Sequence, residues 1–269
     1  MITTPYPVAH DAFVVPSFWA VPGAPGGVHM NTMVLRGAEP VLFDTGIAPD
    51  REDWLAATFS VVEPEDVRWV VLSHDDPDHV GNVEAVMAAC PHATLVANWF
   101  MCERLGPVVQ LDPLRMRWVD AGESLDVGDR VLQFLRPPIY DSPTTRVVFD
   151  PVSRALWAGD MFACPTDRPT PFAEELDADV LAGGFMLFQE ALSPWVRLAQ
   201  RDRWHAVVAE LEALGIWSIA STHGPAFRGW MVDEAFSLLH GLPDAAPMQL
   251  PGQSVLDEVV AGILGQQAA

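Results

Sequence analysis

The chain has 269 residues, half of them apolar, and its 36 acidic residues against 15 basic ones give a formal net charge of −21. All the basic residues other than histidine are arginine. Because so acidic a surface repels phosphate backbones and anionic lipids, we expect neither nucleic acid nor a membrane as a partner. The absence of lysine excludes a catalytic lysine, and no apolar run approaches the length of a membrane span.

The cysteines and the first residues of the chain indicate its compartment. Cys90, Cys102 and Cys164 show no Cys-x-x-Cys spacing, which is typical of reduced thiols rather than of a disulfide framework. The start at residues 1–5 has neither the basic segment nor the apolar core of a secretion signal. We therefore predict a cytoplasmic protein.

Strand-like and helical segments alternate along the chain. Strands are expected, from the apolar and β-branched runs, at residues 12–21, 29–36, 40–43, 67–72, 93–97, 130–135, 146–149, 155–158 and 216–220. Helices are expected at residues 50–59, 81–89 and 195–214. Residues 242–252 are rich in proline and small residues and precede a short apolar helix at 254–264. We therefore predict one α/β domain over residues 1–243 and a C-terminal tail with a short helix over residues 244–269.

The densest group of ionisable residues follows the strand expected at 67–72. This loop contains two histidines and three carboxylates within six residues: His74, Asp75, Asp76, Asp78 and His79. Three carboxylates this close repel one another, and no basic residue nearby in sequence offsets them. A divalent metal would turn that repulsion into ligation, since imidazole and carboxylate both bind such ions. The alternative is a solvated acidic turn, but such a turn has no need of a histidine at both ends.

This loop resembles the metal-binding signature of the metallo-β-lactamase fold, His-x-His-x-Asp-His-x-Gly, with Asp76 in place of the second histidine. An acidic residue there marks the flavodiiron branch of that superfamily, which normally has Glu. Three later segments resemble the remaining family ligand segments in order and place Asp141, Asp160 and His223 at the ligand positions. The resemblance spans residues 12 to 240 approximately, and it implies an αββα sandwich with the metal site along one edge.

The resemblance also divides the ligands into two sites. It implies that His74, Asp76 and Asp141 hold one metal, that Asp78, His79 and His223 hold the other, and that Asp160 bridges both. Asp78 and Asp160 are the residues expected to be catalytic. So many carboxylates favour iron, with manganese or zinc as alternatives. Asp141 departs from the family, which has His there, and the alternative is that Asp141 only caps a turn before Pro143.

Two mechanisms and one non-catalytic role follow from this comparison. The flavodiiron resemblance implies a diiron oxidoreductase that binds O₂, NO or a small oxidisable substrate. We expect no flavin in this chain, because no flavodoxin segment or Gly-rich dinucleotide loop is found, so a separate electron donor would be required. The first alternative is a hydrolase of a small ester, thioester, lactone or phosphodiester. The second is a non-catalytic sensor or interaction protein, and a homodimer is also considered.

Two further features have weaker support. Asp44, in the segment 42–46, matches a family position at which Asp is structural near the site. Five aromatic residues cluster in sequence after Asp160, and they either line a pocket over the metals or belong to the core. They are Phe162, Phe172, Phe185, Phe188 and Trp195.

Overall fold

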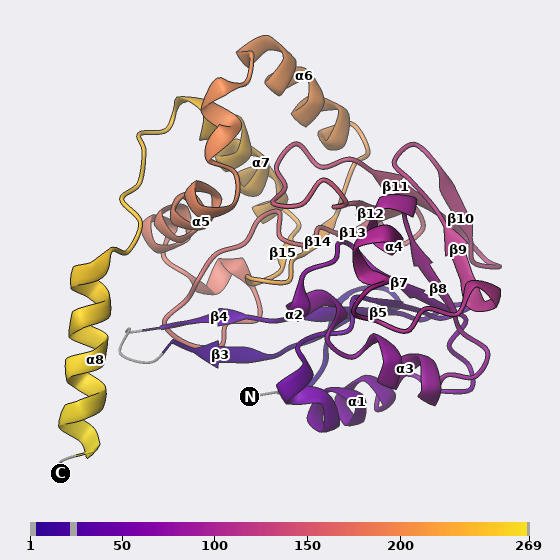
Figure 1. Ribbon diagram of the computed structural model, residues 1–269. Coiled ribbons are helices and arrows are strands. Elements are labelled where there is room, and N and C mark those ends of the chain that lie inside the picture. The colour runs from indigo at the N-terminus through magenta and orange to yellow at the C-terminus, as the bar shows by residue number, and fades with distance from the viewer. Residues whose placement is uncertain (1–3, 22–25, 268–269) are drawn as a thin grey trace.

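The computed structural model describes residues 4–21 and 26–267. Two mixed sheets lie face to face, and helices cover the outer face of each (Figure 1). The first sheet has seven strands in the order β1-β2-β5-β6-β7-β8-β9, and the second has six in the order β10-β11-β12-β13-β14-β15. A separate two-stranded ribbon, β3–β4, extends from the first sheet.

The first sheet is antiparallel from β1 to β6 and parallel from β6 to β9. Its strands are β1 (Tyr6–Ala9), β2 (Ala12–Val15), β5 (Thr32–Leu35), β6 (Val41–Phe43), β7 (Trp69–Val71), β8 (Thr94–Ala97) and β9 (Met116–Trp118). The ribbon consists of β3 (Phe18–Ala20) and β4 (Gly27–His29). The central strands are buried on both faces, which explains their continuous apolar sequences.

The second sheet is antiparallel except for the parallel pair β13–β14. Its strands are β10 (Ser124–Asp126), β11 (Val131–Leu135), β12 (Val147–Asp150), β13 (Ala155–Trp157), β14 (Ser218–Ala220) and β15 (Phe227–Arg228). In β11 buried and less buried residues alternate, as expected for a strand with one face toward the core.

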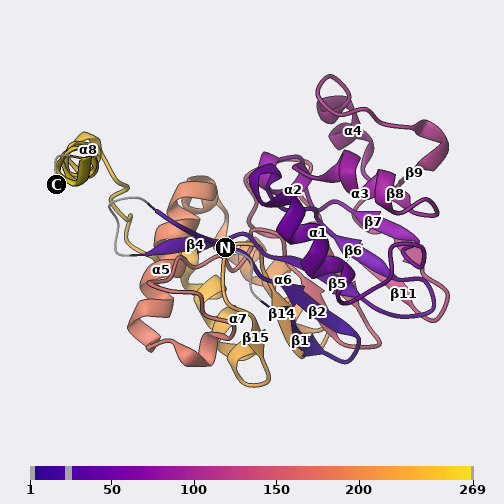
Figure 2. The same ribbon diagram turned by 90° about the horizontal axis from the view of Figure 1, so that it is seen from below.

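The helices fall into two groups and one outlier. Those beside the first sheet are α1 (Arg51–Phe59), α2 (Pro77–Val80), α3 (Val83–Ala89) and α4 (Trp99–Leu105). Those beside the second sheet are α5 (Ala178–Leu192), the 3₁₀ helix η4 (Pro194–Leu198), α6 (Arg201–Glu212) and α7 (Met231–Gly241). The last helix, α8 (Gln253–Gln267), stands away from the rest of the molecule (Figures 1 and 2).

Three hydrophobic clusters hold the layers together. One lies between the first sheet and α1, α3 and α4, and includes Trp54 and Met101. A second lies between the two sheets, and a third lies between the second sheet and α5–α7. Because each interface removes apolar side chains from water, the order of layers is helix, sheet, sheet, helix. The αββα sandwich predicted from the sequence is therefore confirmed.

Most predicted elements are present, but the helix predicted at 195–214 is wrong in its first part. Ala199 and Gln200 have extended backbone (ψ of 146° and 120°), so η4 ends before α6 begins. Val196 and Trp204 are both buried on either side of this break. Their spacing of eight residues fits one helical face, so the hydrophobic pattern contains no sign of the interruption.

The C-terminal segment contains the apolar helix that the sequence predicts, slightly longer at both ends. Its apolar side chains are exposed, among them Leu256 and Leu264. The division into a domain at 1–243 and a tail at 244–269 stays a prediction. Among residues 4–21 and 26–267, no helix combines the length and the apolar character needed to cross a membrane.

Candidate metal site

The candidate ligands lie in loops that follow neighbouring strands, or in the short helix α2 that continues one of these loops. β6 and β7 are parallel, and so are β13 and β14, so within each pair the carboxyl ends meet at the same edge. Asp44 follows β6, His74 follows β7, Asp160 follows β13 and His223 follows β14. Gly159 takes a positive φ of 54°, which turns the chain immediately before Asp160. Strand order thus gathers residues that lie far apart in the sequence.

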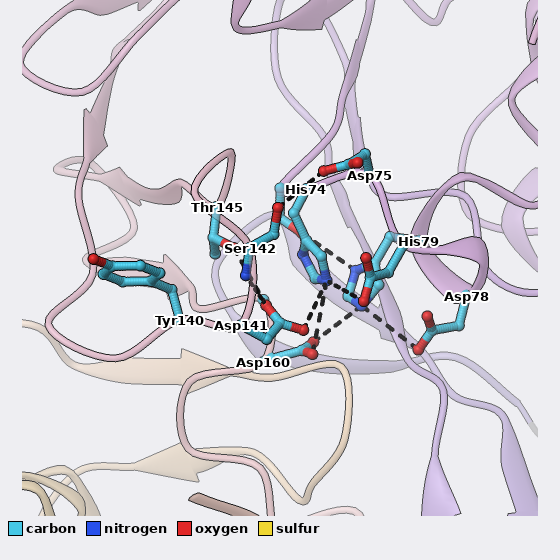
Figure 3. Close-up of polar contacts among 12 residues, drawn as sticks. His74, Asp75, Asp78, His79, Tyr140, Asp141, Ser142, Thr145 and Asp160 are labelled. Atoms are coloured by element: carbon cyan, nitrogen blue, oxygen red, sulfur yellow. Dashed lines mark hydrogen bonds and ion pairs between the residues drawn. The ribbon is translucent and has the colours of Figure 1, made fainter. Parts of the chain in front are cut away.

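Four side chains converge on the first position. The Nε2 atom of His74 lies 4.0 Å from Asp76, 3.7 Å from Asp141 and 3.7 Å from the Oδ2 atom of Asp160. His74 is fully buried, whereas the Asp76 side chain is 43% exposed. One imidazole and three carboxylates therefore meet at the first position, with His74, Asp141 and Asp160 side by side in Figure 3.

The second position is enclosed by Asp78, His79 and His223. His223 Nε2 lies 3.1 Å from Asp78 and 3.3 Å from Asp160 Oδ1, and His79 Nε2 lies 3.0 Å from the same Asp160 oxygen. Asp160 thus presents Oδ2 to the first group and Oδ1 to the second. All seven residues that the sequence singled out lie close together, in three overlapping groups: His74, Asp76 and Asp141; Asp78, His79 and His223; and His74, His79 and Asp160. Their role as metal ligands stays a prediction.

Asp44 holds His79 from behind. The Asp44 carboxylate accepts hydrogen bonds from the Ser73 amide (2.6 Å), the Ser73 hydroxyl (2.7 Å) and the Trp157 indole (3.0 Å). Its Oδ2 atom also lies 2.9 Å from His79 Nδ1. Because Nδ1–H donates to this carboxylate, the lone pair of His79 is on Nε2, the atom that faces the second position. Asp44 thus has the supporting place expected for it.

The other two histidines are oriented in the same way through Nδ1. His223 Nδ1 donates to the backbone carbonyl of His29 at 2.8 Å, and His74 Nδ1 lies 3.0 Å from the Ser73 hydroxyl. In each ring Nε2 faces the other candidate ligands. No sequence pattern indicates that the buried His29 contributes its carbonyl group, because that contact joins residues 194 positions apart.

Unpartnered atoms show that the cluster suits a cation. In the part of the chain that the structure describes, His74 Nε2, His79 Nε2 and Asp160 Oδ1 are buried without a hydrogen bond of acceptable geometry. Buried polar atoms in proteins are nearly always paired. Three such atoms, which lie close to one another and belong to imidazole and carboxylate groups, match the donor set of a divalent metal.

The electrostatics of the first group point the same way. Burial raises the pKa of Asp141, and the negative charge of Asp160 raises it further. Burial likewise raises the pKa of Asp76, and the negative charge of Asp141 adds to this rise. Burial lowers the pKa of His74, and the charge of His79 lowers it further. The first group therefore disfavours both its carboxylate anions and its imidazolium, a conflict that a bound cation resolves.

The second group is balanced by ion pairing. Burial opposes a charge on His79 and His223, but the Asp160 carboxylate overcomes it, raising the pKa of His79 well above its usual range and that of His223 to about 10. Burial also opposes ionisation of Asp78, yet the hydrogen bond from His223 and the charge of His79 lower its pKa to about 2. With no cation present, these three groups and Asp160 stabilise one another as ions, and a bound cation would replace the Nε2 protons of the two imidazoles.

Asp141 both caps its turn and faces His74. Its Oδ1 atom accepts hydrogen bonds from the Ser142 amide at 2.8 Å and the Thr145 hydroxyl at 3.4 Å. Its Oδ2 atom is the one 3.7 Å from His74 Nε2. The two interpretations of Asp141 offered by the sequence are thus compatible, because one oxygen serves the turn and the other serves the site (Figure 3).

Asp75 has a role that the sequence did not reveal. Its carboxylate points away from the two positions and accepts hydrogen bonds from the Ser142 hydroxyl at 3.0 Å and the Thr144 hydroxyl at 2.5 Å (Figure 3). Arg104 pairs with the other oxygen. Asp75 therefore fastens the loop of Asp141 to the loop of His74, across 67 residues of sequence.

The aromatic residues after Asp160 divide between four locations. Phe188 lies against His223, with ring centroids 5.2 Å apart, and forms a wall of the site. Phe162 and Phe185 belong to the cluster beneath α5–α7. Phe172 packs on Tyr6, and Trp195 packs on Tyr140. Of these five, Phe188 is the one that stacks on a residue of the metal site.

Comparison with known proteins identifies the family. The model of the family described as "ODP family beta lactamase" matches residues 28–224, which include all seven residues of the two groups. The chain belongs to the ODP family. Among curated proteins, a putative diflavin flavoprotein A 1 from Thermosynechococcus vestitus is 29% identical over 205 residues, covering 75% of this chain and 34% of that protein. A type A flavoprotein, fprA, from Rhodobacter capsulatus is 27% identical, covering 75% of this chain and 46% of that protein.

Solved structures share the fold of this chain. The flavodiiron protein of Giardia intestinalis superposes with a TM-score of 0.77 at 19% identity, covering 90% of this chain and 59% of that one. The rubredoxin oxygen:oxidoreductase of Desulfovibrio gigas gives a TM-score of 0.80 at 18% identity, covering 91% and 63%. The chain spans about a third to a half of the length of the two curated relatives.

Proposed function

We propose that this ODP-family chain holds two iron ions and that the pair reacts with O₂ or NO, using electrons from a separate donor. One observation carries the proposal: the two groups of side chains close on different oxygens of the same carboxylate, Asp160. A carboxylate that offers one oxygen to each of two adjacent sites is suited to bridge two cations.

The donor set favours iron over zinc. The two groups and Asp160 together offer three imidazoles and four carboxylates. At the first position only His74 provides nitrogen, so that position is strongly anionic. Zinc is commonly held by imidazole or thiolate at low coordination number, whereas carboxylate-rich sites suit iron and manganese.

The residues of the chain fix the donors and keep one side open. Asp44, Ser73 and the His29 carbonyl hold the three imidazoles so that Nε2 faces the cavity. Asp76 and Asp78 are the most exposed members, with side chains 43% and 21% exposed, so small molecules would enter past them. When bound and reduced, the metal pair would supply the coordination positions and the electrons for O₂ or NO. Asp78 and Asp160 would act nearest the reacting molecule.

The family supports the redox chemistry and the separate donor. The two curated relatives are flavoproteins, the Giardia intestinalis neighbour is a flavodiiron protein, and the Desulfovibrio gigas neighbour is named for rubredoxin and oxygen. Those proteins are longer than this chain, so the flavin and the electron supply would be on another polypeptide or segment. We propose that residues 1–269 bind no flavin.

Metal analysis and oxidation kinetics test the proposal. Protein from iron-replete cells, purified without added metal, should contain close to two ions per chain, with iron exceeding zinc. After anaerobic reduction with dithionite, mixing with O₂ or NO in a stopped-flow instrument should change the optical spectrum. The variant Asp160→Asn should lose both metal and spectral change, and Asp257→Asn on the exposed helix α8 is the matched control. Stoichiometric zinc together with ester or lactone hydrolysis would instead support the hydrolase.

A further inference from the structure

A cavity lies on the other side of the loop that carries Asp141. It has a volume of about 960 Å³ and opens between the η4–α6 segment and the end of β11 with the loop that follows. Tyr140 lines it, and in Figure 3 the ring of Tyr140 points away from the residues of the metal site. None of the seven candidate metal ligands lines this cavity. It is therefore a separate site, large enough for a small organic molecule.

Aromatic and apolar side chains form much of its wall. The rings of Tyr140 and Trp195 lie 4.9 Å apart between centroids, at 44° to each other. Leu198, an apolar residue that is 86% exposed, also lines the cavity. A planar ring entering here would cover apolar surface and stack against aromatic faces, both of which favour binding.

Two arginines that line the cavity have no partner. Among the 15 arginines, all within the described ranges, the guanidinium groups of Arg136 and Arg203 make no hydrogen bond, ion pair or ring contact. Each of the others makes at least one. Asp120, whose pKa is lowered by Arg146 and by the more distant charge of Arg136, is already paired with Arg146 at 2.6 Å.

The charge of the cavity is opposite to that of the protein. Its lining contains Arg136 and Arg203 and one carboxylate, Glu210, so it is net positive in a chain of net charge −21. Two guanidinium groups left unpaired amid so many carboxylates are available for an anion from outside the chain. Guanidinium binds carboxylate, sulfonate or phosphate through charge-assisted hydrogen bonds.

We propose that this cavity binds a planar aromatic molecule that carries an anionic group. The ring packs against Tyr140 and Trp195, and the anion pairs with Arg136 and Arg203. Because Ser193 donates a hydrogen bond to the Tyr140 carbonyl at 3.2 Å, the aromatic wall is braced from the start of η4. This cavity does not depend on the identity of the metal, so binding there can be tested independently of the proposed function.

Fluorescence titration with 8-anilinonaphthalene-1-sulfonate, an aromatic anion, tests the site. Wild-type protein should bind one molecule saturably, and added NaCl should weaken binding because the ion pairs are partly exposed. Arg136→Gln and Arg203→Gln should each weaken binding about tenfold, the loss expected for one charge-assisted pair. Arg201→Gln is the matched control, because Arg201 lies on the same helix as Arg203, pairs with Asp244 and does not line the cavity.

A neutral analogue separates charge recognition from simple apolar adsorption. N-phenyl-1-naphthylamine has the same rings without the sulfonate, and its weaker binding should be the same in wild type and in both cavity variants. The proposal is overturned if the sulfonate binds equally to wild type, Arg136→Gln and Arg203→Gln, or if Arg201→Gln lowers binding as much. It is also overturned if sedimentation shows that the two cavity variants abolish self-association, since the cavity would then be covered by a second copy.

Discussion

Replacing Asp44 with Asn should test how the metal site is supported without changing any candidate ligand. Asn keeps the shape of Asp and, like Asp, tolerates the positive φ of 58° at this position. One oxygen remains to accept from the Ser73 amide. The other becomes an NH₂ group facing the Trp157 indole N–H and His79 Nδ1. The buried N–H groups of Trp157 and His79 would then face this NH₂ group, which cannot accept a hydrogen bond from them. The change therefore acts on hydrogen bonding rather than on packing.

The hydrogen bonds of the Asp44 carboxylate set the size of the effect. Leaving the buried Trp157 N–H unpaired costs about 1–3 kcal/mol, and removing the carboxylate partner of His79 adds to that, so the free energy of unfolding should fall by roughly 2–4 kcal/mol. His79 can restore a bond only by accepting at Nδ1, which places a proton on Nε2 and removes the lone pair that faces the second position. Metal affinity should therefore fall about 10- to 100-fold.

Urea unfolding of metal-free protein and chelator competition with loaded protein measure the two effects. Asp50→Asn is the matched control, because Asp50 also accepts from a serine hydroxyl (2.6 Å) and a tryptophan indole (2.9 Å), and its partners Ser17 and Trp19 lie outside the metal site. We expect a smaller loss of stability and no loss of metal in that variant. Equal metal affinity in Asp44→Asn and wild type would refute the orienting role of Asp44.

Three further predictions concern the bridge, the unusual ligand and the thiols. Asp160→Ala should lose both metal ions, since Asp160 faces both groups; full metal content by elemental analysis would show a purely structural residue. Asp141→His removes one negative charge from the first position, so the reduction potential should rise in a redox titration while metal content survives; an unchanged potential in this variant and in Asp141→Ala would mean that Asp141 is not a ligand. Burial raises the pKa of Cys90 to about 11 and of Cys164 to about 12, so at pH 8 both stay as thiols, and iodoacetamide should label the less buried Cys102 first; mass spectrometry showing early label on Cys164 would contradict this.

The sequence indicated which residues lie together where the signal was local. His74, Asp76, Asp78 and His79 fall within six residues, in the loop after β7 and the short helix α2, and the apolar run before them indicated a strand end. Their grouping with Asp160 came from resemblance to a known family, not from spacing alone. The strand order that brings these loops to one edge depends on pairings such as β13 with β14, which no local pattern encodes.

What the sequence could not predict depends on distant contacts. Asp75 is one of three acidic residues in the His74 segment, but its partners Ser142 and Thr144 lie 67 and 69 residues further along. The break before α6 leaves the hydrophobic spacing intact, so it had no signature. Arg136 and Arg203 are far apart in the sequence, and only the fold shows that they line one cavity.

The three imidazoles of the metal site have unequal partners at Nδ1, and this makes the two positions chemically distinct. The Nδ1 atom contacts a carboxylate in His79, a peptide carbonyl in His223 and a hydroxyl in His74. A negatively charged partner makes an imidazole a stronger electron donor than a neutral one does. The two positions would thus differ in metal affinity. The second position, with two imidazoles, would bind mainly through electron donation, and the first, with three carboxylates, mainly through charge. Increasing concentrations of a chelator would then remove the two ions one after the other. A protein that holds a single ion would be populated between the two steps.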